Sequence, residues 1–335
     1  MGTYLVKRIA QLVLVVWAAV TIIFLLFFAL PGDPARLLTG AEGKIPDKTI
    51  NLMNEKYGFN DPLIVQYGNY MQRVVTWDLG QSFKSNDSIN DLVKDKSKNS
   101  IRLAFWAVAI ECVVGIGAGI YSAVRRYTFA DTFITFMTVA ASAVPVYVLG
   151  LLFQRMLAVT PNKREWPAWT QFPTGGLGPD SWFAFIIPTG HQWKYLILPA
   201  ITLASVSTAV TARMMRTTML EIERSDFIRT ARAKGLSEYK VLTRHAMRNA
   251  LIPVVTLIAI DLGTAIGVAV LTETVYNWPG LGSEIAQAVG QRDFAVILGL
   301  SIPVIAFYAL CNLLADLTYA GLDPRIRLGG KGAER

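Results

Sequence analysis

Six long apolar runs restrict the folds that this chain can adopt. They are Ile9–Leu30, Ile101–Val124, Phe133–Leu157, Tyr195–Ala212, Leu251–Leu271 and Phe294–Tyr319. A helix needs about 20 predominantly apolar residues to cross the roughly 30 Å hydrocarbon core of a bilayer. The composition agrees, because 53% of the 335 residues are hydrophobic and only 17% are charged. The sequence therefore predicts an all-α integral membrane protein with about six transmembrane helices.

The runs divide the chain into successive parts. Residues 1–30 hold a short basic N-terminus and the first span, which we interpret as an uncleaved signal anchor because no clear cleavage site follows it. Residues 31–100 are expected to form an outer cap, with helical patterns at 51–57 and 62–77. Residues 101–328 hold five spans, an outer loop at 158–194 and an inner loop at 221–250. Residues 329–335 are a short tail.

Basic residues cluster next to the apolar runs and set the expected orientation. Nine Lys or Arg residues lie between Arg213 and Arg248, and Arg125 and Arg126 stand between the second and third runs. Because basic loops are retained on the cytoplasmic side, this face and both termini are predicted to be cytoplasmic. The same rule explains the net charge of +8, so no nucleic-acid partner is expected.

The inner loop at 221–250 has the pattern of two short helices at a membrane surface. Gly235 is placed to end the first helix and Ser237 to cap the second. In the second helix Tyr239, Leu242, Ala246 and Ala250 recur at helical spacing and predict an apolar face suited to an interface. Periodicity alone leaves two interpretations open, a basic amphipathic segment on anionic lipid or a surface for a partner protein.

Particular motifs give this loop a closer interpretation. The runs Arg229-Thr-Ala-Arg-Ala-Lys-Gly235 and Arg244-His-Ala-Met-Arg-Asn-Ala-Leu-Ile-Pro253 closely resemble the cytoplasmic loop of the dipeptide/oligopeptide permease family, membrane subunits of bacterial ABC importers. The resemblance extends over nearly the whole chain. It is carried by Pro31-Gly-Asp-Pro34, by Glu273-Thr-Val-Tyr-Asn-Trp-Pro-Gly-Leu-Gly282 and by Leu322-Asp-Pro-Arg-Ile-Arg327. The chain resembles the first of the two peptide permease subunits.

This resemblance implies a type I importer fold in the bacterial inner membrane and a set of partners. These are a homologous second permease subunit, two cytoplasmic ATPases that bind ATP and Mg, and an extracytoplasmic substrate-binding protein. The ATPase-coupling residues implied are Thr230, Ala231, Ala233, Gly235, Leu236, Glu238, Lys240 and Arg244. Within the loop, Ala231 is expected to pack against the ATPase, Gly235 to form the bend, and Glu238, Lys240 and Arg244 to make polar contacts.

The sequence favours neither an enzyme nor a cofactor site in this chain. It has no complete nucleotide-binding motif, no HExxH and no GxSxG, so ATP hydrolysis is expected in partner subunits. Cys112 and Cys311 lie inside apolar runs and are interpreted as packing residues. His191 and His245 are predicted on opposite sides of the membrane, so no metal site is expected.

Three residues within the apolar runs are candidates for the pathway. Glu111 and Asp261 would be costly facing lipid, so they either line a pathway or pair inside the bundle. Pro145 should kink the third span, either at a cavity wall or for packing alone. Gly115 and Gly119 are better explained as a close helix–helix contact than as part of a dinucleotide motif.

Two questions stay open at the level of sequence. Trp166, Trp169, Trp182 and Trp193 in the outer loop fit either an aromatic belt or a contact surface for a binding protein. Peptide is the expected cargo, with chelated nickel, glutathione or an oligosaccharide as alternatives. From other classes, an ATP-independent channel or secondary transporter, or a lipid-binding scaffold, would also use such a chain.

Overall fold

A computed structural model describes residues 2–28, 60–82, 84–179, 182–183 and 185–322 of the chain. The predicted motif at 31–34, the helical pattern at 51–57 and the tail at 329–335 lie outside these residues. The described residues form two compact units. One comprises residues 101–278 and 310–322, and the other comprises residues 2–100 and 279–309.

Five helices of the described residues are long and apolar enough to cross a membrane. They are Leu5–Phe28, Ile89–Val124, Gln192–Glu223, Glu238–Val275 and Phe294–Thr318. A sixth crossing is made if the bent pair Phe129–Ala143 and Val146–Lys163 counts as one span. The predicted all-α membrane fold with about six spans is thus confirmed.

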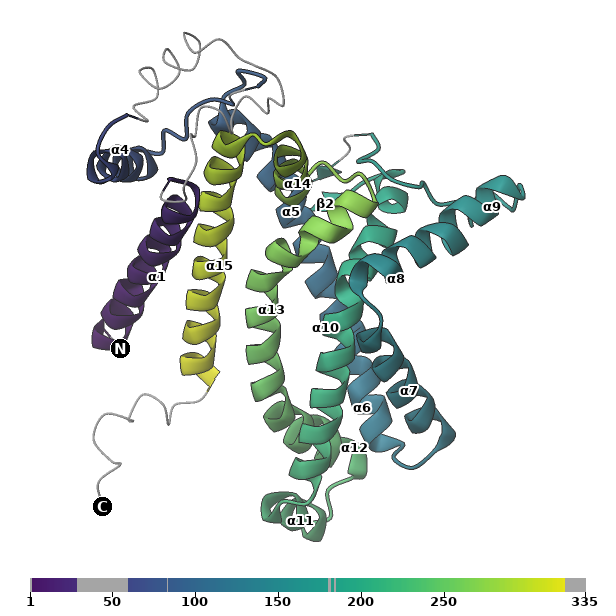
Figure 1. The fold of residues 1–335 in the computed structure, drawn as a ribbon. Coiled ribbons are helices and arrows are strands. Elements are labelled where there is room, and N and C mark those ends of the chain that lie inside the picture. The colour runs from purple at the N-terminus through teal and green to yellow at the C-terminus, as the bar shows by residue number, and fades with distance from the viewer. Residues whose placement is uncertain (1, 29–59, 83, 180–181, 184, 323–335) are drawn as a thin grey trace. The chain divides into compact units, whose positions relative to one another are not determined.

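The larger unit is built around one central helix. Its helical elements are α5 (Ile89–Ile110, from residue 101), a π-helical segment (Glu111–Gly115), α6 (Ile116–Val124), α7 (Phe129–Ala143), α8 (Val146–Phe153), a π-helical segment (Gln154–Val159), α9 (Thr160–Lys163), α10 (Gln192–Glu223), α11 (Asp226–Ala233), α12 (Glu238–Lys240), a π-helical segment (Val241–Ala246), α13 (Met247–Val275) and the end of α15 (Phe294–Leu322, from residue 310). Helix α10 packs against α6, α7, α8 and α13 (Figure 1).

Small residues allow the close approach of α6 to α10. A Cβ atom built on Gly119 would lie 2.6 Å from the Ala212 carbonyl oxygen and 2.6 Å from the Met215 Cβ. At Gly115 it would lie 3.0 Å from the Thr211 Cγ2. Only a residue without a side chain fits such a crossing, so the predicted packing role of this glycine pair is confirmed.

The third predicted span is broken at Pro145. Helix α7 ends at Ala143, α8 starts at Val146, and the two helices are bent by 108°. The break at Pro145 is confirmed, but a single helix over 133–157 is wrong. The bend is large because α8 has its own contacts: the Tyr276 hydroxyl donates to the Gly150 carbonyl at 3.1 Å and lies 2.9 Å from the Thr202 hydroxyl.

The loop at 158–194 is anchored to α5 by side-chain contacts. It contains a small antiparallel hairpin of β1 (Trp182–Phe183) and β2 (Ile187–Pro188). The Arg102 guanidinium lies 4.2 Å from the Trp182 ring centre and donates to the Phe185 carbonyl at 2.7 Å. The Trp106 indole donates to the Ile186 carbonyl at 2.9 Å. These contacts hold the hairpin in place.

The second unit contains α1 (Gly2–Phe28), α4 (Leu63–Thr76), the start of α5, α14 (Leu281–Gln291) and the start of α15 (Phe294–Leu322). Helix α4 confirms the predicted helical pattern in the outer cap. Helix α5 starts at Ile89 and not at Ile101, because Ile89 is fully buried in an apolar core with Leu281 and Leu300. The first half of this helix is polar, so the apolar run in the sequence does not indicate where the helix starts.

Candidate functional site

The larger unit contains a cavity of about 430 Å³ that brings the three predicted pathway residues together. Glu111, Pro145 and Asp261 all line it, although they come from three separate parts of the chain. The remaining lining is mostly apolar and is supplied by α5, α7, α8, α10 and α13. A largely apolar cavity with a few convergent polar groups is the usual form of a ligand site or pathway.

Two carboxyl groups lie in this cavity. Glu111 is almost fully buried, and its Oε1 accepts a hydrogen bond from the Thr211 hydroxyl at 2.6 Å. The Asp261 carboxyl lies close enough to interact directly with that of Glu111. The hydroxyl-bearing residues Ser207 and Thr264 line the same space. The arrangement gives an otherwise apolar cavity a polar wall.

Glu111 begins a π-helical segment between α5 and α6. Such a segment inserts an extra residue into the helix and often occurs at functional sites. Its hydrogen bond to Thr211 crosses from this helix to α10. In the structure Glu111 lines the cavity and is also hydrogen-bonded inside the bundle.

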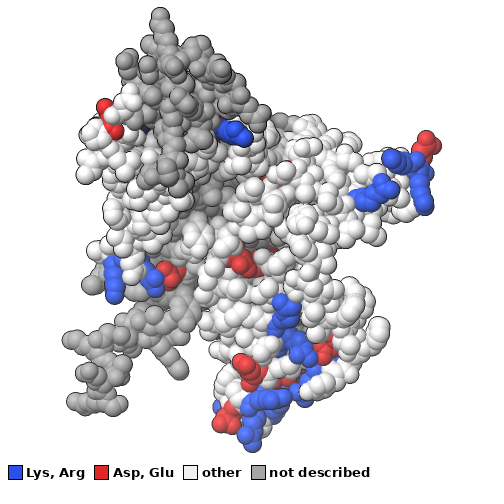
Figure 2. Space-filling view, viewed as in Figure 1, with Lys and Arg blue, Asp and Glu red and all other residues white. Residues whose placement is uncertain are grey.

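The predicted coupling loop lies between α10 and α13. Helix α11 ends at Ala233, and Gly235 follows with a φ of +76°, as expected for a glycine just beyond a helix C-terminus. A Cβ on Gly235 would meet no atom within 4 Å, so backbone conformation and not space selects glycine there. Charged side chains gather at the end where α11 and α12 lie (Figure 2).

An ion pair closes the bend. Arg232 Nη2 donates to Glu238 Oε1 at 2.6 Å, and Arg232 Nε donates to Glu238 Oε2 at 3.1 Å. This bidentate bond to Glu238 raises the pKa of Arg232 above its ordinary value. Because the two residues flank Gly235, the pair holds the end of α11 beside the start of α12.

Most of the predicted coupling residues lie on the surface of this loop. The exposed residues are Thr230, Ala233, Gly235, Leu236, Glu238, Lys240 and Arg244. Ala231 differs, since it is buried in an apolar cluster with Met215 and Met219 of α10. Its side chain therefore packs inside this chain, which leaves little of it to contact a partner.

The expectation of a separate short second helix is wrong. Residues 238–275 form one continuous helix, and Tyr239 is 77% exposed. The π-helical segment Val241–Ala246 shifts the register, so that Val241 and Ala246, five residues apart, are both buried. Tyr239 thereby turns outward. Together with the half-exposed Phe227, it gives the loop an exposed aromatic surface.

The loop and the cavity are connected by the same two helices. Helix α10 lines the cavity with Leu203, Ala204, Val206 and Ser207, and α13 lines it with Asp261, Thr264, Ala265 and Val268. Both helices end in the loop, α10 at Glu223 and α13 through the continuous helix that starts at Glu238. A displacement of the loop would therefore act on two walls of the cavity.

Comparison with known proteins places these features in a family. Residues 115–328 match the family described as binding-protein-dependent transport system inner membrane component, and residues 1–104 match the corresponding N-terminal family. The chain is 34% identical to a dipeptide transport system permease protein of Alkalihalophilus pseudofirmus, over 98% of this chain and 100% of the relative.

Two Escherichia coli relatives show the same extent of similarity. A probable D,D-dipeptide transport system permease protein is 35% identical, over 97% of each chain. A glutathione transport system permease protein is 33% identical, over 98% of this chain and 99% of the relative. The protein is thus a multi-pass protein of the bacterial inner membrane, and it belongs to the inner-membrane components of binding-protein-dependent transport systems.

Proposed function

We propose that this chain is one of two permease subunits of an ATP-driven importer for dipeptides or oligopeptides, and that it forms half of the translocation pathway. The observation that carries the proposal is the joint role of α10 and α13, which both line the cavity and both end in the exposed loop. The names of the relatives support peptide as the cargo.

The partners in this proposal are a homologous permease subunit, two cytoplasmic ATPases and an extracytoplasmic binding protein. The ATPases bind ATP and Mg and carry out hydrolysis, so the chain itself holds no cofactor. The basic loop faces the cytoplasm, as do both termini, because the loop-charge rule favours this orientation. The ATPases then dock on the exposed residues around Gly235.

In this mechanism, ATP binding draws the ATPases together and moves the loop. The displacement passes into α10 and α13 and opens the cavity to alternate sides of the membrane, with Glu111 and Asp261 providing its polar wall. The work comes from the difference in ATPase binding between the two states, since a partner shifts an equilibrium only by its differential affinity.

The test is uptake by vesicles that contain this chain with its co-encoded partners, using peptides of graded length, including glutathione, with and without ATP. The Gly235→Arg variant should still assemble with its partner subunits, but it should take up less peptide per ATP hydrolysed. Gly290→Arg is a matched control, because that glycine also has no atom near a built Cβ but has an ordinary helical φ. Uptake without ATP would support a channel or secondary transporter instead. Hydrolysis without peptide uptake would direct the search to nickel chelates or oligosaccharides.

A further inference from the structure

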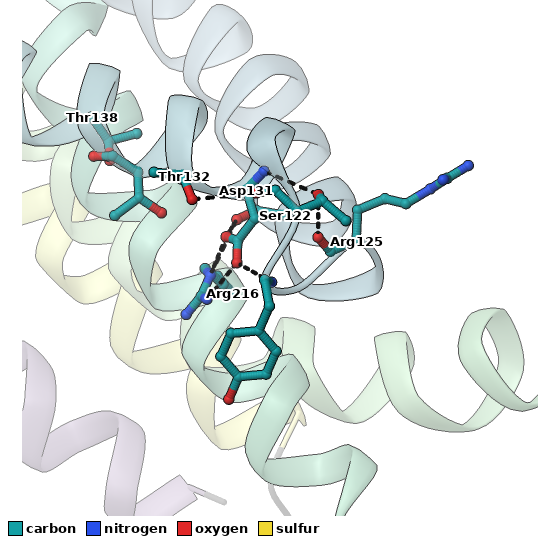
Figure 3. Close-up of polar contacts among 9 residues, drawn as sticks. Ser122, Arg125, Asp131, Thr132, Thr138 and Arg216 are labelled. Atoms are coloured by element: carbon teal, nitrogen blue, oxygen red, sulfur yellow. Dashed lines mark hydrogen bonds and ion pairs between the residues drawn. The ribbon is translucent and has the colours of Figure 1, made fainter.

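An ion pair between a buried carboxylate and a partly buried arginine joins α7 to α10 in the larger unit (Figure 3). Asp131, in the first turn of α7, accepts two hydrogen bonds from Arg216 of α10, one from Nε and one from Nη2, each at 2.8 Å. The Ser122 hydroxyl and the backbone N–H of Tyr127 also donate to this carboxylate. Asp131 is almost fully buried, and its two oxygens are saturated by these four donors.

Helix α7 connects this ion pair to the cavity. It starts two residues before Asp131 and ends at Ala143, which lines the cavity together with Ser142, Val144 and Pro145. Its 15 residues span about 22 Å at 1.5 Å per residue. At the cavity end, the Arg213 Nη1 donates to the Ser142 hydroxyl at 3.1 Å, which is a second tie between α10 and α7.

The other partner of the pair lies close to the coupling loop. Arg216 is about two turns before α10 ends at Glu223. Its neighbours Met215 and Met219 are fully buried in one apolar cluster with Ile228 and Ala231 of α11. Because protein interiors are tightly packed, a displacement of α11 is passed to this part of α10.

Geometry also argues against a role limited to holding the α6–α7 turn. That turn has its own capping, because the Thr128 hydroxyl donates to the Arg125 carbonyl at 2.6 Å and accepts from the Asp131 N–H at 3.5 Å. The bidentate bond to Arg216 instead crosses to another helix. Bidentate guanidinium–carboxylate bonds fix orientation as well as distance, which suits a contact that must transmit movement.

We infer that Asp131 and Arg216 are positioning residues that make α7 follow α10 when the coupling loop moves, and so carry the movement to the cavity wall at Ser142–Pro145. The inference rests on the proposed function for the source of the movement. In this inference α7 moves as a rigid helix, with the ion pair at one end and the Pro145 break at the other.

The test uses the assembled complex with two readouts. A spin label at Phe136→Cys, an exposed position on α7, reports ATP-dependent change in its surroundings. Uptake per ATP hydrolysed reports coupling. Asp131→Asn should abolish the label response and lower uptake per ATP about fivefold or more, the lower bound for typical coupling energies. Glu284→Gln is the matched control, since it also removes a carboxylate from a partly buried ion pair, that with Lys96.

Arg216→Lys provides a second variant in case Asp131→Asn does not fold. It keeps the positive charge but loses the planar fork, so the label response should weaken while the protein still assembles. Equal losses of assembled complex, hydrolysis and uptake, with an unchanged label response, would overturn the inference in favour of a purely structural pair. If the wild-type complex hydrolyses ATP without moving peptide, the proposed cargo fails, but the label response still decides the role of the pair.

Discussion

The contact of Gly119 with α10 allows a prediction of stability worked from the structure. Adding one methyl group in Gly119→Ala places a carbon atom 2.6 Å from the Ala212 carbonyl oxygen and 2.6 Å from the Met215 Cβ. Neither atom is the end of a flexible side chain, so α6 and α10 must separate. Overpacking of this kind costs about 1–3 kcal/mol.

Gly117→Ala is the matched control for this prediction. It makes the same substitution on the same helix, two residues away, where a Cβ would meet no atom within 4 Å. The gain of about 1 kcal/mol from replacing a helical glycine by alanine applies to both variants and cancels in their comparison. The difference between the two is therefore the packing cost alone.

The assay is thermal unfolding of the purified variants in the same detergent. Gly119→Ala should unfold at a lower temperature than Gly117→Ala, by an amount equivalent to about 1–3 kcal/mol of unfolding free energy. Gly119→Leu should lower it further. If the two alanine variants are equally stable, the close approach of α6 to α10 does not determine the glycine at 119.

Three further perturbations follow from individual contacts. Gly235→Val should cost about 1–2 kcal/mol because of the left-handed backbone, and Gly235→Asn less; equal melting temperatures for the two would contradict this conformational reason. Glu111→Gln keeps an acceptor for Thr211, so the melting temperature should hold while uptake of peptide falls; parallel losses of both would assign Glu111 to packing. Arg102→Ala removes the contact with Trp182 and should increase proteolysis within residues 158–194, whereas Arg102→Lys should preserve part of the protection; unchanged cleavage in Arg102→Ala would show that other contacts hold the hairpin.

Local features of the fold could be predicted because each depends on a short stretch of sequence. Apolar length defines a span, and Gly235 meets the requirement for a positive φ just past a helix. Pro145 marked a break for the same reason, since it lacks a backbone donor. The angle of 108° could not be predicted, because it depends on contacts of α8 with Thr202 and Tyr276, which are distant in the sequence.

Helical periodicity failed where the helix itself was irregular. The common face expected for Tyr239 and Ala246 assumed 3.6 residues per turn, but the segment Val241–Ala246 is π-helical and adds a residue to the turn, so that Tyr239 is exposed and Ala246 is buried. From Ala246 onward the regular spacing returns, and Ala250 and Val254 follow as buried residues at intervals of four. Sequence alone carries no reliable sign of such an insertion, so the register before it was assigned to the wrong face.

Charged residues are hard to interpret from sequence for a different reason. The same arginine can help to orient the protein in the membrane and also form a specific ion pair. Arg216 was one of nine bases explained by the loop-charge rule, and Asp131 was an acid at the edge of an apolar run. The rule depends only on the number of basic residues and on the side of the membrane where they lie. In the structure, however, Arg216 pairs with Asp131, which is 85 positions away in the chain. The cost of burying Asp131 without a partner is what demands such a pairing. An acid at the inner end of a span, opposite a basic loop, is therefore a reason to search for one arginine that meets it.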